Sequence, residues 1–234
     1  MISAKMRIKE RLQCIIQRLA EVYPTAHCEL DFETPFQLLV ATILSAQCTD
    51  KRVNIVTRDL FPKYPTAYEI AAVGQDELEG LIKTTGFYRN KAKNLRAMAK
   101  DLVEKHRGEV PRTMAELTEL AGVGRKTANV VLGNAFSIAE GIVVDTHVAR
   151  LSKRFGLTKQ EEPEKIEAIL MRLVPRSQWT IFSHWLIWHG RRRCYARNPD
   201  CSNCELASVC PSYGKLAKTA ASTARPVSRK KAIA

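Results

Sequence analysis

Residues 117–131 read LTELAGVGRKTANVV and form the most informative part of the chain. Two helical patterns are joined there by a short hairpin that contains Gly122 and Gly124. Glycine tolerates a positive φ and lets another backbone approach closely, and the helix that follows begins with N–H groups that lack a partner within the helix. Such a helix start attracts anions, and phosphate is the anion expected for a basic protein. A plain turn between two helices is the alternative.

The charge balance favours a polyanionic partner. The 234 residues include 37 Lys and Arg against 24 Asp and Glu, which gives a formal charge of +13 and a pI of about 9.6. Six of the positive charges lie in residues 214–234, which contain no acidic residue and few large apolar ones. We therefore predict a disordered basic tail at 214–234, with seven net charges left on the folded part. A solvated charged face would explain such a surplus as well.

Composition excludes several other classes of protein. With 45% hydrophobic and 26% charged residues, the chain is expected to fold rather than to be disordered throughout. No apolar run approaches the ~20 residues that cross a bilayer, and the start, MISAKMRIKERLQ, lacks the apolar core of a secretory signal. We expect a soluble intracellular protein, cytoplasmic and nucleoid-associated if bacterial. Its seven cysteines are then not expected to form disulfides, which raises the question of metal binding.

Apolar residues recur at helical spacing along most of the chain. Thr34 before Pro35 is typical of a helix start, with a capping side chain followed by proline at the first helical position. Strand-like alternation is scarce. We therefore predict an all-α architecture. The stripes that support this prediction lie within residues 8–22, 36–44, 95–102, 166–173 and 179–186.

Lys126 lies just inside the second helix of the hairpin, and Asp145 follows in the stretch VVDTHVAR at 143–150. Lys126 is either one more phosphate-contacting lysine or an amine nucleophile, since the positive potential of a helix start disfavours the ammonium form. Asp145 directly precedes a helical pattern, where aspartate commonly acts as an N-cap. A cap and a catalytic carboxylate are compatible roles. Sequence spacing alone does not bring Lys126 and Asp145 together.

Four cysteines cluster near the end of the chain. Cys194, Cys201, Cys204 and Cys210 leave gaps of six, two and five residues. Four thiolates in so short a segment would repel one another unless a cation held them, and structural zinc and an iron–sulfur cluster both meet that need. The spacing favours neither metal. The loop contains Arg197 and follows three arginines. The metal-bound cysteines are therefore interpreted as a structural anchor that holds a basic loop in place.

These features together resemble a known family. The pattern at 117–131, with its glycines and apolar residues, resembles the helix-hairpin-helix motif that grips the DNA backbone without reading sequence, and with the VDTHV stretch and the cysteine loop it resembles the bacterial endonuclease III family of DNA glycosylase/AP lyases. The resemblance implies a two-lobed all-α glycosylase fold with a C-terminal iron–sulfur cluster loop. It places a six-helix lobe at 28–137 and a cluster lobe at 1–27 plus 138–213, before the tail at 214–234.

The resemblance also implies functional roles for particular residues. It implies a 4Fe–4S cluster on the four cysteines, Lys126 as the nucleophile and Asp145 as its carboxylate partner. The expected substrate is double-stranded DNA with damaged pyrimidines or abasic sites, the expected pathway is base excision repair, and we expect a monomer without membrane contacts. The hairpin residues expected to contact DNA are Gly122, Val123, Gly124, Arg125 and Thr127, and Arg197 is expected to do so from the cysteine loop.

Two further residues match the family's positions for probing the duplex. Gln47, in SAQCTD at 45–50, is the candidate for filling the gap left by an extruded base, although a polar residue at a helix end would look the same. Phe87, in TGFYRNKA at 85–92, lies where the family has an intercalating loop, although a core aromatic residue would also fit.

Three alternative functions are weighed against this interpretation. An adenine-specific mismatch glycosylase would typically lack the lysine and carry a further C-terminal domain. A pyrimidine-dimer glycosylase on the same scaffold would differ only in the shape of its pocket. A non-catalytic iron–sulfur DNA-binding regulator would explain the charge, the hairpin and the cysteines, but it would not require Lys126 with Asp145.

Overall fold

The computed structural model describes residues 6–217, and every regular element in that range is helical. The prediction of an all-α protein is thereby confirmed. The elements are α1 (Ile8–Val22), α2 (Pro35–Leu44), α3 (Asp50–Leu60), α4 (Ala67–Ala72), α5 (Gln75–Ile82), η1 (Lys83–Thr85), α6 (Tyr88–His106), α7 (Met114–Glu119), α8 (Arg125–Ala135), α9 (Thr146–Arg154), α10 (Pro163–Leu173), η2 (Arg176–Gln178) and α11 (Trp179–Arg192).

The chain divides into two compact units. One comprises residues 27–143 and is called the hairpin unit here; the other comprises the described residues 6–26 and 144–217 and is called the cysteine unit. The divisions fall after Ala26 and Val143, compared with 27 and 137 expected from the sequence. The N-terminal helix therefore belongs to the same unit as the cysteines.

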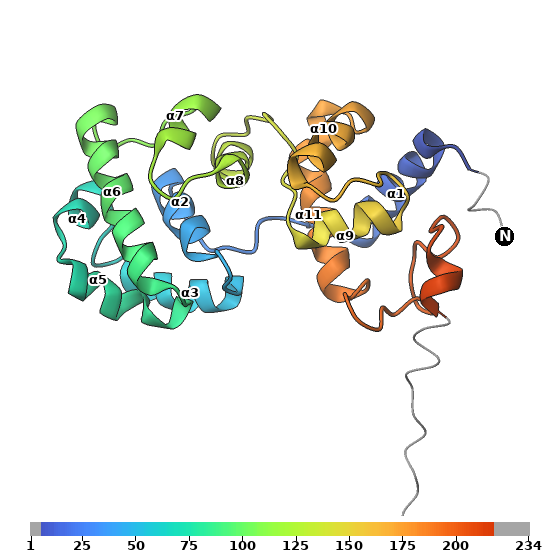
Figure 1. Cartoon of the computed structure of the whole chain (residues 1–234), viewed down its shortest axis with the longest axis horizontal. Helices are drawn as coiled ribbons and strands as arrows, with labels where there is room; N and C mark the ends of the chain where they lie inside the picture. The colour runs from blue at the N-terminus through green and yellow to red at the C-terminus, as the bar shows by residue number, and fades with distance from the viewer. Residues whose placement is uncertain (1–5, 218–234) are drawn as a thin grey trace, which may run out of the picture. The chain divides into compact units, whose positions relative to one another are not determined.

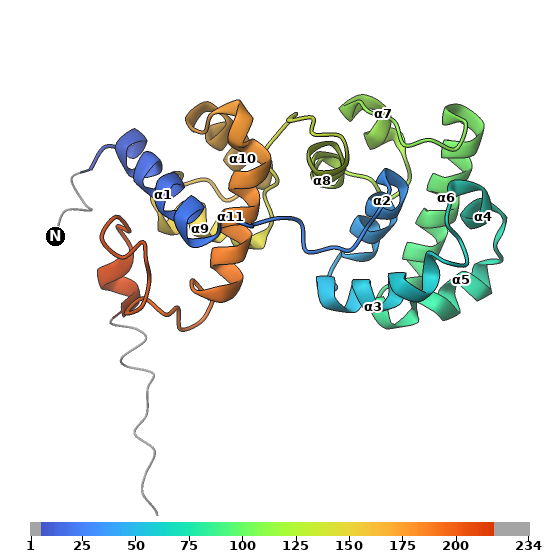
Figure 2. The same cartoon turned by 180° about the vertical axis from the view of Figure 1, so that it is seen from behind.

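The hairpin unit is built around α2. This helix packs against α3, α6 and α8, and every residue from Leu38 to Leu44 is buried. The Thr34 side chain accepts a hydrogen bond from the Gln37 N–H at 3.2 Å, and Pro35 begins the helix, as its sequence predicts. The long helix α6 packs against both α4 and α5, which the two opposite views show along one side of it (Figures 1 and 2).

The cysteine unit is organised by α11. This helix packs against α1 and α9, and Phe182 and Leu186 on it are fully buried. The indole N–H of Trp185 donates to the Tyr23 carbonyl just after α1 at 3.2 Å, so a side chain near the end of the protein anchors the first helix. Because α1 supplies buried Leu12, Ile15 and Leu19, the unit needs both ends of the sequence to complete its core.

The predicted basic tail at 214–234 falls largely outside the described residues. Residues 213–217 form one short helical segment, and 218–234 lie beyond the part that the structure describes. No helix among residues 6–217 is long and apolar enough to cross a membrane.

Candidate nucleic-acid interface and cysteine loop

The hairpin at 117–131 consists of the end of α7, a tight turn and the start of α8. Gly122 has a φ of +77°, and a Cβ there would lie 3.0 Å from the Asn94 Cβ, so this position needs glycine for both its dihedral angle and its close contact. Gly124 has an ordinary φ of −94° and open space around it. The two glycines therefore meet different demands: one shapes the turn, and the other leaves the start of α8 accessible.

The start of α8 faces solvent. Gly124 occupies the N-cap position and has no side chain to satisfy the first N–H groups of the helix. Arg125 and Lys126 are exposed and Thr127 is half-buried, whereas Val123 and Ala128 are buried and attach the turn to the core. N–H groups at a helix start without a capping side chain, beside two exposed cationic side chains, form an anion-binding surface.

Asp145 occupies the N-cap position of α9 in the cysteine unit. Its Oδ1 accepts a hydrogen bond from the Val148 N–H at 2.8 Å, so one carboxylate oxygen holds the start of the helix. The side chain is half-buried. On the next turn, Arg150 contacts His147 Nδ1 at 3.2 Å and donates to the Gly190 and Cys194 carbonyls at 3.1 and 3.0 Å. The helix that begins at Asp145 is thus tied to the end of α11 and to the first cysteine.

The four clustered cysteines lie in one loop whose sulfurs influence one another electrostatically. Burial, with smaller contributions from neighbouring Cys194 and Cys210, raises the pKa of the Cys204 thiol to about 12. Burial also raises the pKa of Cys201 and of Cys210, again with contributions from other cysteines of the loop. Within residues 6–217, no three His, Cys, Asp or Glu side chains are close enough to hold a single metal ion.

Arginines fasten this loop to the helices around it. Arg154 at the end of α9 contacts Cys194 Sγ at 3.1 Å and donates to the Tyr195 and Ala196 carbonyls at 2.7 and 2.9 Å. Arg193 donates to Asp200 at 2.7 Å and to Glu205 at 2.9 Å. The Arg154 contacts were not predictable from sequence, because Arg154 and Cys194 are forty residues apart.

A buried histidine lies beside Cys204. His189 is 1% exposed; its Nε2 lies 3.6 Å from Cys204 Sγ and its Nδ1 lies 3.1 Å from the Tyr23 hydroxyl. Burial lowers the pKa of His189 to about 4, so the ring is neutral at pH 7. Sequence reasoning did not single out this residue, which lies in an apolar helix five positions before Cys194.

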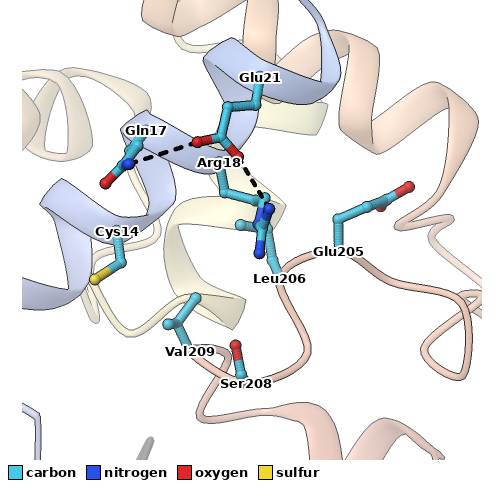
Figure 3. Close-up of a pocket in the computed structure, with 8 residues that line it drawn as sticks. All are labelled: Cys14, Gln17, Arg18, Glu21, Glu205, Leu206, Ser208 and Val209. Atoms are coloured by element: carbon cyan, nitrogen blue, oxygen red, sulfur yellow. Dashed lines mark hydrogen bonds and ion pairs between the residues drawn. The ribbon is translucent and has the colours of Figure 1, made fainter.

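A hollow of about 260 Å³ lies between α1 and residues 205–209 (Figure 3). The charged side chains on its wall already have partners: Arg18 pairs with Glu21 at 2.9 Å, and Glu205 pairs with Arg193. The charges on the wall of the hollow are therefore compensated by ion pairs. In contrast, the start of α8 presents two exposed cationic side chains, Arg125 and Lys126, which suit an anionic ligand.

Gln47 and Phe87 lie on two exposed turns of the hairpin unit. Both have left-handed backbones, with φ of 53° at Gln47 and 49° at Phe87, a conformation that is uncommon for residues other than glycine. Phe87 is 63% exposed, which rules out the core-aromatic alternative. Gln47 is exposed in the turn between α2 and α3. Arg197 is exposed in the cysteine loop, in the other unit.

Sequence and structure comparisons identify the relatives of this protein. The family model described as HhH-GPD superfamily base excision DNA repair protein matches residues 40–176. The chain is 55% identical to Endonuclease III of Synechocystis over 87% of its length and 93% of the relative. It is 42% identical to Endonuclease III of Escherichia coli K12, over 88% of its length and 96% of the relative.

Solved structures give the same result. A non-covalent Endonuclease III–DNA complex superposes with a TM-score of 0.87 at 44% identity, covering 91% of this chain and all of that one. A trapped Endonuclease III–DNA covalent intermediate superposes with a TM-score of 0.86, also at 44% identity, covering 90% of this chain and 99% of that one. The chain therefore belongs to the endonuclease III family of HhH-GPD base excision DNA repair proteins.

Proposed function

We propose that this protein is a bifunctional DNA glycosylase and AP lyase that excises oxidised pyrimidines, of the thymine glycol type, in base excision repair. The observation that carries the proposal is an exposed lysine, Lys126, at the start of α8 in a chain that superposes on a trapped protein–DNA covalent intermediate. The substrate is double-stranded DNA carrying a damaged pyrimidine or an abasic site. In a bacterium, the site of action is the nucleoid.

The hairpin is the proposed grip on the DNA backbone. The turn at Gly122, Val123 and Gly124 brings a phosphate to the N–H groups at the start of α8, and Arg125 and Thr127 add side-chain donors. Backbone contacts of this kind hold the duplex without reading its sequence, as an enzyme that searches for damage requires. Arg197 adds a positive charge from the cysteine loop.

Lys126 is the proposed nucleophile. Its free amine attacks C1′ of the deoxyribose, the C1′–N bond to the base breaks, and the departing base takes the electron pair. The C1′–O4′ bond of the sugar then opens, O4′ takes up a proton, and C1′ forms an imine with the lysine nitrogen. This imine makes the C2′ protons acidic. Loss of one C2′ proton expels the 3′ phosphate by β-elimination and cuts the strand.

Asp145 is the proposed carboxylate partner of this reaction. It accepts the proton that the attacking amine must lose, and it stabilises the positive charge that develops on the sugar. Its role as the cap of α9 suits this function, because the Val148 hydrogen bond fixes the direction of the carboxylate.

Gln47 and Phe87 are proposed to enter the duplex at the lesion. A damaged pyrimidine stacks and pairs poorly, so its extrusion costs less than the few kcal/mol estimated for an intact base. The glutamine would fill the gap left by the extruded base, and the exposed aromatic ring would stack in the opposite strand.

We further propose that Cys194, Cys201, Cys204 and Cys210 hold a 4Fe–4S cluster. Four neighbouring cysteines in one loop supply the four thiolates that such a cluster takes as ligands, and their sulfurs lie close enough to influence one another electrostatically. When bound, the cluster supplies a cationic core that compensates the thiolates and fixes the loop that bears Arg197. Protein without iron but with stoichiometric zinc would refute this assignment.

Borohydride trapping tests the proposed chemistry. The reductant should convert the lysine imine into a stable covalent adduct with DNA that contains thymine glycol or an abasic site. Lys126→Gln should abolish the adduct, whereas the control Lys100→Gln, on the exposed side of α6, should form it at the wild-type rate. An adduct that persists in Lys126→Gln would refute the lysine assignment.

A lesion panel tests the substrate class. Release of thymine glycol but not of an intact pyrimidine dimer is the expected result, and the reverse preference would identify a pyrimidine-dimer glycosylase. If the wild type binds DNA but neither releases a base nor forms an adduct with any substrate, the protein is a non-catalytic DNA-binding regulator.

A further inference from the structure

One lysine of the hairpin unit is buried, and its ammonium donates hydrogen bonds to backbone carbonyls of the protein. Lys91, in the first turn of α6, is 4% exposed. Its ammonium donates a hydrogen bond to the Leu44 carbonyl at 2.8 Å and another to the Thr85 carbonyl at 2.8 Å. It makes no ion pair with a carboxylate among the described residues. A buried cation that donates to two carbonyls and faces no carboxylate is costly to maintain, and such a group calls for a role.

The two acceptors are the last residues of two helices. Leu44 ends α2 and Thr85 ends η1, so both carbonyls lie at the negative ends of helices, where the peptide dipoles favour a cation. This arrangement explains how the ammonium is stabilised without a carboxylate. It also means that Lys91 links three segments: the start of α6, the end of α2 and the end of η1.

Both acceptors lie immediately before the two exposed left-handed turns. Leu44 precedes Gln47 by three residues, and Thr85 precedes Phe87 by two. Left-handed conformations of residues other than glycine persist only where the surrounding structure holds them. Lys91 is a link that joins both turns directly, since it binds the backbone that leads into each one.

We propose that Lys91 is a positioning residue for base extrusion: its ammonium holds the turns bearing Gln47 and Phe87 at a fixed separation, so that both side chains enter the duplex together. The inference rests on the proposed function, in which these two residues probe the DNA. Lys91 itself touches no DNA, because its amine is enclosed between the two carbonyls. Because Lys91 orders the two turns in the free protein, DNA binding does not have to bear the entropic cost of ordering them.

The experiment measures extrusion apart from the chemistry. In the Lys126→Gln background, which holds DNA without reacting, 2-aminopurine is placed opposite thymine glycol and its fluorescence reports unstacking. Affinity is measured for this duplex and for an undamaged duplex of the same length. Lys91→Met should reduce the ratio of these affinities about tenfold or more, the effect of losing charged hydrogen bonds. Affinity for undamaged DNA should change less than about twofold, because the hairpin is untouched.

Two further variants guard against a general loss of stability. Lys91→Gln can reach at most one of the two carbonyls, and we expect it to fall between wild type and Lys91→Met in lesion selectivity. If Lys91→Met does not fold, unchanged selectivity in Lys91→Gln alone overturns the proposal. Lys100→Met, which removes an exposed lysine from the same helix, should keep the wild-type selectivity and melting temperature.

A double-mutant cycle distinguishes positioning from a structural role. If Lys91 acts through the two probing side chains, Lys91→Met should cause no further loss of selectivity in a Gln47→Ala, Phe87→Ala background. A full additional loss there would refute the proposal. Failure of the proposed function is recognised separately, since it would appear as wild-type protein that forms no borohydride adduct.

Discussion

The two glycines of the hairpin should respond differently to the same substitution. In Gly122→Ala, the backbone of residue 122 must keep a φ of +77°, and the added methyl group must lie 3.0 Å from the Asn94 Cβ. The left-handed conformation alone costs an L-residue about 1–2 kcal/mol. For a unit of this size, that cost should lower the melting temperature by about 3–8 °C. Gly122→Ala should therefore destabilise the protein before any DNA is present.

Gly124→Ala is the matched control. Its φ of −94° suits any residue, and a Cβ there meets no atom within 4 Å. Alanine is a poorer N-cap, but it also restricts the unfolded chain, and these opposed effects of a few tenths of a kcal/mol offset each other. We expect its melting temperature to change by less than about 1 °C. Its methyl group would instead occupy the space that the proposed grip leaves for a DNA phosphate, so affinity for a duplex with an abasic-site analogue should fall about 3- to 10-fold.

Circular dichroism melts and fluorescence anisotropy of labelled duplexes measure the two effects independently. We expect Gly122→Ala to lower the melting temperature and Gly124→Ala to lower the affinity for DNA, although both variants add the same methyl group. Equal melting temperatures for the two variants would refute the reasoning from the dihedral angle. Unchanged affinity in Gly124→Ala would refute close approach of the DNA backbone at that residue.

Three other outcomes follow from the cysteine unit. Asp145→Asn keeps a good N-cap but removes the negative charge, so the borohydride trapping rate should fall about 100-fold or more at an unchanged melting temperature; wild-type trapping would contradict the carboxylate role. Burial lowers the pKa of His189 to about 4, below its unfolded value, so its neutral form stabilises the fold above about pH 6.5 and this stability, on the order of 3 kcal/mol, is lost as the pH falls towards 4. Melting temperatures from pH 7 to 4 should therefore fall less steeply in His189→Gln, and parallel curves would exclude His189 as the source. Arg193→Lys removes the two-pronged contact with Glu205, worth up to about 1 kcal/mol, and should speed the loss of absorbance from the proposed iron–sulfur cluster in the presence of a chelator; an equal rate would mean that the pair does not hold the loop.

The all-α architecture and the hairpin were predictable from sequence because their causes are local. Helical periodicity depends on residues three and four positions apart, and the capping of α2 by Thr34 before Pro35 depends on neighbours in the chain. The need for glycine at 122 follows from the geometry of a turn a few residues long. The spacing of the cysteines likewise shows that they share one loop. Family membership could therefore be expected from sequence motifs.

Contacts between residues distant in the sequence required the tertiary structure. Nothing in the sequence links Lys91 to the Leu44 carbonyl, 47 residues away, or Tyr23 to His189, 166 residues away. Phe87 could equally have been a core residue, since an aromatic side chain near a helix start fits either environment; packing left it 63% exposed. The sequence by itself determined the local conformations and the chemical groups available. Burial and long-range hydrogen bonding determined which of those groups stabilise the fold and which are exposed on the surface where DNA can bind. Burial and long-range hydrogen bonds depend on residues that are brought together only when the chain folds.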